Sequence, residues 1–245
     1  MPDAAPEGKV LAVIKETDQT NSLVVDLPNR SFLERKPGQY ATIRIKRADG
    51  WSEPHPFTIS CPPAEGSLLR FTIKKAGGFT SAVPDFPPGA PVRCAGPFGA
   101  FCKDIETHNE IVMIAGGVGI TPFLSVLRHF RDIKAQNRIQ LFWCNKTLGD
   151  AFSLNELAGM TRELSLRVVH VLSREKNAAN RHDPSLPAVT YESGRLARNT
   201  LLKYGVTPGA AYYLCGPGAM QDTVLAELAG CGVDPGKVER EKFGR

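Results

Sequence analysis

The stretch IVMIAGGVGITP, Ile111–Pro122, joins an apolar strand to a glycine-rich turn and a helix start. Thr121 is a good N-terminal residue for a helix, with Pro122 at the first helical position. The glycines of Gly116-Gly117-Val118-Gly119 allow a backbone to approach a pyrophosphate, whose charge suits the unpaired N–H groups of a helix end. Pro122 replaces the last glycine of the usual G-x-G-x-x-G pattern, and a turn without a ligand is the alternative interpretation.

Strands and helices alternate on both sides of this turn, from Glu110 onward. The expected strands are Ile111–Ala115, Ile139–Trp143, Leu166–Leu172 and Ala211–Cys215, and the expected helices are Pro122–Lys134, Ser153–Leu164 and Gly218–Leu228. This alternation predicts a doubly wound parallel sheet with right-handed crossovers. Ligands of such a sheet bind at the carboxyl ends of its strands.

The first half of the chain has a different pattern, in which short β-type segments are separated by Pro, Gly, Asn and Asp. These segments are Lys9–Ile14, Ser22–Leu27, Gln39–Ile45, Leu68–Lys74 and Pro91–Cys94. Their spacing predicts a small antiparallel barrel. The expected fold is therefore β plus α/β, with a β-barrel domain over residues 1–104 and a nucleotide-binding α/β domain over residues 105–245.

The composition is that of a soluble globular protein, with 42% apolar and 22% charged residues, and no apolar run approaches the length of a membrane span. The N-terminus lacks a secretory pattern, which predicts a cytoplasmic location. The six cysteines show no spacing typical of an iron–sulfur cluster or a zinc site. A scattered net charge of +5 disfavours nucleic acid and leaves two alternatives, an ordinary surface or a basic docking face for an acidic redox partner.

Two further segments lie at the predicted ligand edge of the sheet. Ser173 and Arg174 suit a ribose 2′-phosphate and favour NADPH, whereas the adjacent Glu175 is the kind of residue that binds an unphosphorylated ribose. A solvated Arg beside a capping Ser is the alternative. Cys215-Gly216-Pro217 ends a later strand; a buried Cys there is most often core, but its position makes it a candidate to contact a nicotinamide ring.

The segment His55-Pro56-Phe57-Thr58 offers an aromatic ring and a hydroxyl group on one strand, which is the set needed to stack a flavin and hydrogen-bond its edge. His55 could contact a phosphate. Taken alone, Phe57 is more readily a barrel core residue and His55 a surface residue. A short helix is expected to begin near Thr80, after Gly77-Gly78, with its N-terminal end facing a phosphate. A flavin beside a nicotinamide points to hydride transfer.

Together these motifs resemble the ferredoxin–NADP reductase superfamily from Lys9 to Arg245. His55-Pro56-Phe57-Thr58 stands where that family has Arg-x-Tyr-Ser/Thr, and Gly78-Phe79-Thr80-Ser81 matches its flavin-phosphate turn. The glycine-rich turn with Thr121 and Pro122, together with Cys215-Gly216-Pro217, matches its nicotinamide motifs. Glu241-Lys242-Phe243 is similar to its C-terminal Glu-x-aromatic ending.

The resemblance implies a role for each matched segment. Phe57 would stack on the flavin, Thr58 would hydrogen-bond near its N5, and Ile73, Lys74 and Gly78–Ser81 would hold its phosphates. Phe243 would cover the opposite face of the ring and yield to the nicotinamide. Cys215 and Glu241 would line the site of hydride transfer, so that the expected catalytic residues are Thr58, Cys215, Glu241 and Phe243.

His and Phe in place of Arg and Tyr are similar to the dehydrogenase domains of membrane ferric reductases and NADPH oxidases, which use FAD. The expected function is therefore an FAD-dependent NADPH reductase that passes single electrons to a separate ferredoxin, flavodoxin or haem protein. Direct reduction of ferric chelates or free flavin is one alternative. A non-catalytic electron-relay subunit of a larger complex is the other, and peripheral docking to a membrane haem protein stays open.

Overall fold

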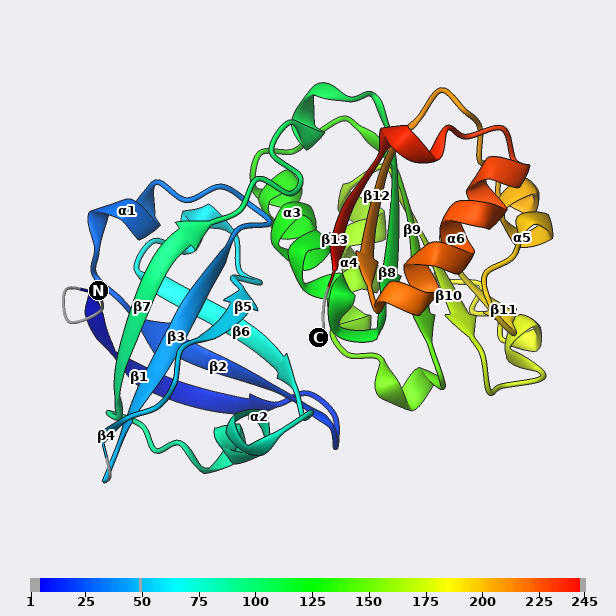
Figure 1. Cartoon of the computed structure of the whole chain (residues 1–245). Coiled ribbons are helices and arrows are strands. Elements are labelled where there is room, and N and C mark those ends of the chain that lie inside the picture. The colour runs from blue at the N-terminus through cyan, green and yellow to red at the C-terminus, as the bar shows by residue number, and fades with distance from the viewer. Residues whose placement is uncertain (1–4, 49, 243–245) are drawn as a thin grey trace. The chain divides into compact units, whose positions relative to one another are not determined.

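A computed structural model describes residues 5–48 and 50–242 of the chain, in two compact units (Figure 1). The first unit contains the chain up to Lys103 together with Thr121–His129. The second contains Asp104–Ile120 and the residues from Phe130 onward. Within the described ranges, no helix combines the length and the apolarity needed to cross a membrane.

The first unit is an antiparallel sheet with the strand order β4-β3-β7-β1-β2-β6, in which β5 also pairs with β3. Its strands are β1 (Glu7–Lys15), β2 (Thr20–Asp26), β3 (Tyr40–Arg47), β4 (Gly50–Trp51), β5 (His55–Thr58), β6 (Leu68–Lys74) and β7 (Pro91–Phe98). A bridge between Ile59, just after β5, and Phe71 connects the chain beside β3 to β6, the last strand of this order. The sheet thereby closes into the predicted barrel.

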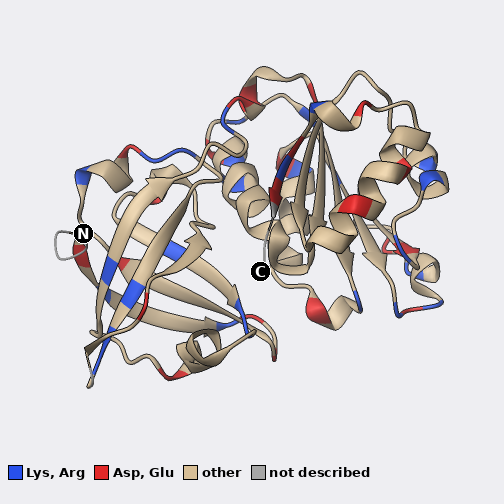
Figure 2. Ribbon diagram, in the orientation of Figure 1, with Lys and Arg blue, Asp and Glu red and all other residues tan. Residues whose placement is uncertain are grey.

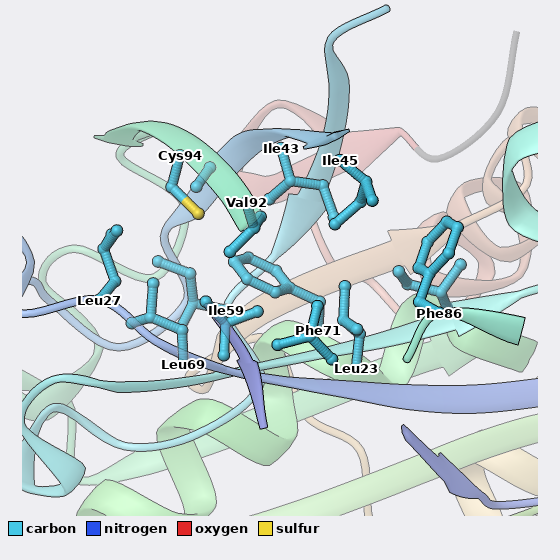
Figure 3. Packing of buried hydrophobic residues seen from close by; sticks show 14 of the residues in the cluster. Leu23, Leu27, Ile43, Ile45, Ile59, Leu69, Phe71, Phe86, Val92 and Cys94 are labelled. Carbon is cyan, nitrogen blue, oxygen red and sulfur yellow. The ribbon is translucent and has the colours of Figure 1, made fainter. Parts of the chain in front are cut away.

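Alternating side chains of these strands fill the barrel, as the period of two in a strand requires. Leu23 of β2, Ile43 and Ile45 of β3 and Phe71 of β6 are fully buried and point toward one another (Figure 3). Two short helices accompany the strands, α1 (Arg30–Leu33) and α2 (Gly78–Ala82). Asn29 caps α1 by accepting the Ser31 backbone N–H.

The second unit is a parallel sheet with the strand order β11-β10-β9-β8-β12-β13. Its strands are β8 (Glu110–Gly116), β9 (Arg138–Asn145), β10 (Leu166–Leu172), β11 (Val189–Ser193), β12 (Ala211–Gly216) and β13 (Val238–Lys242), and its helices are α4 (Leu154–Glu163), α5 (Arg198–Lys203) and α6 (Gly218–Gly230). The helix α3 (Thr121–Asp132) follows β8 in the chain, but its residues up to His129 belong to the first unit. The predicted fold class, a barrel and a doubly wound parallel sheet, is confirmed.

The predicted boundaries of the helix after the glycine-rich turn are wrong. The glycine-rich turn forms a 3-10 turn, Gly117–Ile120, and α3 begins directly after it at Thr121, one residue before the predicted start. The helix ends at Asp132, two residues before the predicted end. Lys134 has a φ of 52°, outside the helical region, and Ala135 donates its N–H to the Phe130 carbonyl oxygen. The left-handed residue ends the helix.

Candidate functional site

The parallel sheet reverses its strand order at β8 and β12, the position at which such sheets bind ligands. A Cβ at Gly119 would collide with the carbonyl oxygen of Cys215, and one at Gly216 would lie 3.0 Å from the Cα of Gly116. The packing of the two strand ends therefore requires Gly119, although its place in the motif suggested a role in approaching a pyrophosphate.

Gly117 has a different environment, with a φ of 54° and no atom within 4 Å of the position that a Cβ would take. Its carbonyl oxygen accepts a hydrogen bond from Nε1 of Trp143 at 2.9 Å. Trp143 is fully buried, with its ring edge-on to Phe152 at 5.3 Å and 5.7 Å from His170. Burial lowers the pKa of His170 to about 4, so this ring is neutral near pH 7. The indole fixes the turn while one side of Gly117 stays open.

Replacing Trp143 with Phe should lower the free energy of unfolding by about 1–3 kcal/mol, because the Gly117 carbonyl loses its donor inside the protein. Urea unfolding followed by circular dichroism measures this change. Trp51→Phe is the matched control, since Trp51 is only half-buried and belongs to the first unit. Equal losses in the two variants would show that the indole hydrogen bond contributes nothing to the turn.

Cys215 and Glu241 are neighbours across β12 and β13, in direct register. Burial, and to a smaller extent Glu241, raises the pKa of the fully buried Cys215 thiol, which is therefore neutral near pH 7. Burial first, and then the charge of Glu239, raises the pKa of Glu241 from 4.5 to about 7. Oε2 of Glu241 is buried without a hydrogen-bond partner among the described residues. This edge therefore holds a thiol and a carboxyl group that can carry a proton at neutral pH.

Gln221, in the first turn of α6, ties these strand ends together. Its Nε2 donates to the carbonyl oxygens of Gly216 at 2.9 Å and Glu241 at 2.8 Å. The sequence analysis missed both Gln221 and Trp143, because a lone Gln in a helix and a lone Trp in a strand are ordinary residues there. Pro217 immediately precedes α6. Phe243, the expected cover of the flavin, lies outside the described residues.

The loops after β9 and β10 form the other end of this edge. Ser173 and Arg174 are exposed, as is Lys146, which ends up beside them because the Arg174 N–H donates to the Lys146 carbonyl oxygen at 2.8 Å. The hydroxyl of Ser173 donates to the Asn145 carbonyl oxygen at 3.3 Å. The predicted position for a ribose phosphate is thus flanked by Ser173, Arg174 and Lys146, whose backbones lie side by side at this edge.

In the first unit, β5 carries the predicted flavin motif. Phe57 is half-buried and packs against the barrel core, while Pro56 is exposed. The His55 ring stacks on Phe79 at a centroid distance of 4.0 Å, and Phe57 lies 6.0 Å from the same ring. Two residues of the motif, His55 and Phe57, are therefore brought together beside Phe79, a buried residue of α2.

The turn into α2 differs in detail from the prediction. Oγ1 of Thr80 accepts the backbone N–H groups of Ala76 at 2.8 Å and Gly77 at 2.9 Å, so these donors are used within the turn. A Cβ at Gly77 or Gly78 would have no atom within 4 Å, and neither glycine has a positive φ. Neither packing nor backbone conformation requires these two glycines, and their backbone lies open to a bound group.

The remaining predicted flavin residues have distinct positions. The side chain of Ile73 is buried in the barrel core, Lys74 is half-buried and Ser81 is exposed. Thr58 is 4% exposed, and its Oγ1 has no hydrogen-bond partner among the residues that the structure describes. A buried hydroxyl without a partner is costly, and a flavin edge would satisfy it. The motif of β5 and the open glycines of α2 thus fit a flavin.

The predicted residues form two groups, one in each unit. His55, Phe57 and Thr58 with the turn of α2 belong to the first unit, and the sheet edge with Cys215 and Glu241 belongs to the second. Lys and Arg, and Asp and Glu, occur at scattered positions along the ribbon of both units (Figure 2). Of the net charge of +5, the residues of the first unit carry +4 and those of the second carry +1.

Two family models match the chain, one in the N-terminal part of the sequence and one in the C-terminal part. A model of an FAD-binding domain matches residues 8–87, and a model of an oxidoreductase NAD-binding domain matches residues 113–225. The reductase component of propane 2-monooxygenase from Mycolicibacterium goodii is 28% identical over 238 residues, which cover 96% of this chain and 66% of that protein. The chain spans between 45% and 66% of the length of the curated relatives that it matches here.

Solved structures share the fold over nearly the whole chain. Flavohemoglobin from Malassezia yamatoensis, with bound FAD and heme, superposes with a TM-score of 0.81 at 24% identity and covers 98% of this chain and 60% of its own. A ferredoxin NADP+ reductase from Neisseria gonorrhoeae, with bound FAD and NADP, gives a TM-score of 0.74 at 19% identity and covers 96% of this chain and 97% of its own. At 24% and 19% identity, these two superpositions show that the fold is shared.

Proposed function

Because this chain belongs to the ferredoxin–NADP reductase superfamily of flavoprotein oxidoreductases, we propose that it uses NADPH to reduce FAD and passes electrons singly to a separate protein. The buried Thr58 hydroxyl without a partner, in the segment that resembles the flavin motif, is the observation that carries the flavin assignment. FAD, when bound, would accept two electrons from a nicotinamide and release them one at a time.

The residues of the chain have distinct parts in this proposal. Thr58 donates a hydrogen bond to the flavin edge, and Phe57 offers its ring for stacking. Cys215 stays a neutral thiol and excludes water from the strand end, because it is fully buried. Glu241, with a pKa of about 7, holds or releases a proton at the same edge.

For the electron acceptor we propose an oxygenase component, a ferredoxin or a haem protein. The curated relatives include reductase components of propane 2-monooxygenase and flavohemoproteins. These names support an electron acceptor that is not formed by the residues that this chain shares with them. The test is to reduce the FAD-loaded protein anaerobically with NADPH and then to offer ferredoxin, flavodoxin, a haem protein and a ferric chelate in turn. A flavin that NADPH does not bleach would refute the proposal.

Replacing Phe57 with Ala should weaken FAD binding by about 1–3 kcal/mol, the range of aromatic stacking on a base. FAD affinity is measured by fluorescence titration of the cofactor-free protein. Phe98→Ala is the matched control, because Phe98 is 43% exposed and belongs to the same unit. An FAD affinity that is equal in the Phe57 variant and the unmodified protein would make Phe57 a core residue.

A further inference from the structure

Glu175 joins the loops that follow β9 and β10. Its Oε1 accepts the backbone N–H of Leu148 at 2.6 Å, and its Oε2 accepts Nη2 of Arg181 at 2.8 Å. The Leu148 N–H first, and then Arg181, hold the pKa of Glu175 below its usual range. Glu175 is therefore an ionised carboxylate with a hydrogen-bond partner on each oxygen. In the sequence it suggested a contact with an unphosphorylated ribose, but in the structure it connects the two loops.

Backbone hydrogen bonds extend this connection toward the strands. The N–H of Ser173 donates to the Asn145 carbonyl oxygen at 3.0 Å, and the N–H of Arg174 donates to the Lys146 carbonyl oxygen at 2.8 Å. In the Lys146 loop, Oδ2 of Asp150 accepts the backbone N–H of Thr147 at 3.0 Å. The two loops thus hold each other in register at the carboxyl edge of the sheet.

This register places the backbones of two residues with long cationic side chains, Lys146 and Arg174, side by side. Lys146 and Arg174 are both exposed, and over residues 5–48 and 50–242 neither forms an ion pair. Two cations at neighbouring backbone positions repel each other unless an anion lies between them. A phosphate monoester carries a charge of about −1.5 to −2 near pH 7, which matches two cations better than one.

We propose that Lys146 is a second specificity-determining residue for the 2′-phosphate of the nucleotide, held beside Arg174 by Glu175. The inference rests on the proposed use of NADPH. Lys146 contacts the phosphate through its ammonium group, while Glu175 is a positioning residue that does not touch the nucleotide. The 2′-phosphate is the chemical group that both cations recognise.

Calorimetric titration of the FAD-loaded protein with 2′,5′-ADP and 5′-ADP tests this proposal without turnover. Lys146→Gln should weaken 2′,5′-ADP binding by about fivefold, as expected for one exposed charge-assisted contact, and should leave 5′-ADP binding unchanged. Lys237→Gln is the matched control, because it removes the same charge at an exposed residue just before β13, at the opposite edge of the sheet.

The Glu175 variants separate positioning from charge. Removing a negative charge should by itself tighten 2′,5′-ADP binding, whereas loss of the connection between the loops should weaken it. We expect Glu175→Ala to weaken 2′,5′-ADP binding by about fivefold. Glu175→Gln should bind 2′,5′-ADP at least as tightly as the unmodified protein, because it loses the negative charge while its amide oxygen can still accept the Leu148 N–H. Tighter binding by Glu175→Ala would overturn the positioning role.

The outcomes also separate this inference from the proposed function. If the unmodified protein binds 2′,5′-ADP more tightly than 5′-ADP and Lys146→Gln keeps that difference, the role of Lys146 is wrong and the use of NADPH stands. If the unmodified protein binds both nucleotides equally, both the use of NADPH and the role of Lys146 are wrong. The Lys146 side chain is exposed, so its variant is expected to fold.

Discussion

Replacing Glu241 with Gln should raise the free energy of unfolding at pH 8 by up to about 3 kcal/mol and leave it unchanged at pH 4. The pKa of Glu241 rises from 4.5 to about 7 in the folded protein. Below pH 4.5 the carboxyl is protonated in both states and costs nothing. As the pH rises from 4.5 to 7 the unfolded chain loses this proton before the folded chain does, so stability falls. Above pH 7 the full cost remains, and Gln avoids it.

Tryptophan fluorescence can follow the unfolding of the second unit, which contains Glu241. The chain has two tryptophans, of which Trp143 belongs to the second unit and Trp51 to the first, so a Trp51→Phe background reports on the second unit alone. Urea unfolding between pH 4 and pH 8 then compares Glu241 with Gln. Asp222→Gln is a control for the loss of one carboxylate, at an exposed position of α6. Parallel stability curves for Glu241 and its Gln variant would contradict the raised pKa.

Replacing Arg174 with Ala should weaken NADPH binding by about one to two orders of magnitude, because a charge-assisted contact is worth about 1.5–3 kcal/mol. NADH binding should change little, since NADH lacks the 2′-phosphate. Steady-state kinetics with both nucleotides and a fixed artificial acceptor give the ratio of the two kcat/KM values.

Arg167→Ala is the matched control for this ratio. Arg167 is exposed on the same strand, β10, but near its amino end, whereas Arg174 follows its carboxyl end. The Arg167→Ala variant should lower the total charge by the same amount and leave the ratio of kcat/KM for NADPH to kcat/KM for NADH unchanged. Equal losses with NADPH and NADH in the Arg174 variant would mean that Arg174 attracts the nucleotide as a whole and does not select the phosphate.

Periodicity and turn chemistry were sufficient to predict the barrel, the parallel sheet and the segments at the ligand edge. Leu166–Leu172 and Leu68–Lys74 were predicted with the bounds that the structure has, because each is a continuous apolar or alternating run between clear breaks. β13 was missed as a strand because its sequence, VEREK, is mostly charged. An edge strand needs few apolar residues, so its pattern resembles a surface loop.

Contacts between distant segments could not be predicted in this way. The hydrogen bond from Trp143 to Gly117 joins β9 to a turn that follows β8, and it depends on the strand order. The burial of Glu241 likewise depends on β13 pairing beside β12. Glu175, whose carboxylate in the sequence favoured NADH, accepts the Leu148 N–H in the structure and thereby connects two loops. Each of these features is a property of the assembled sheet and not of any local pattern.

The different surroundings of the glycines predict which of them would be conserved in a homologue that had lost cofactor binding. Gly119 and Gly216 would persist, because larger residues there would force apart the ends of β8 and β12. Gly77 and Gly78 have open space around them and would be free to mutate. A homologue that no longer binds cofactors would therefore keep Gly119 and Gly216 but could lose Gly77 and Gly78. The two glycines with open space, and not the two packed ones, would then indicate whether a homologue still binds cofactors.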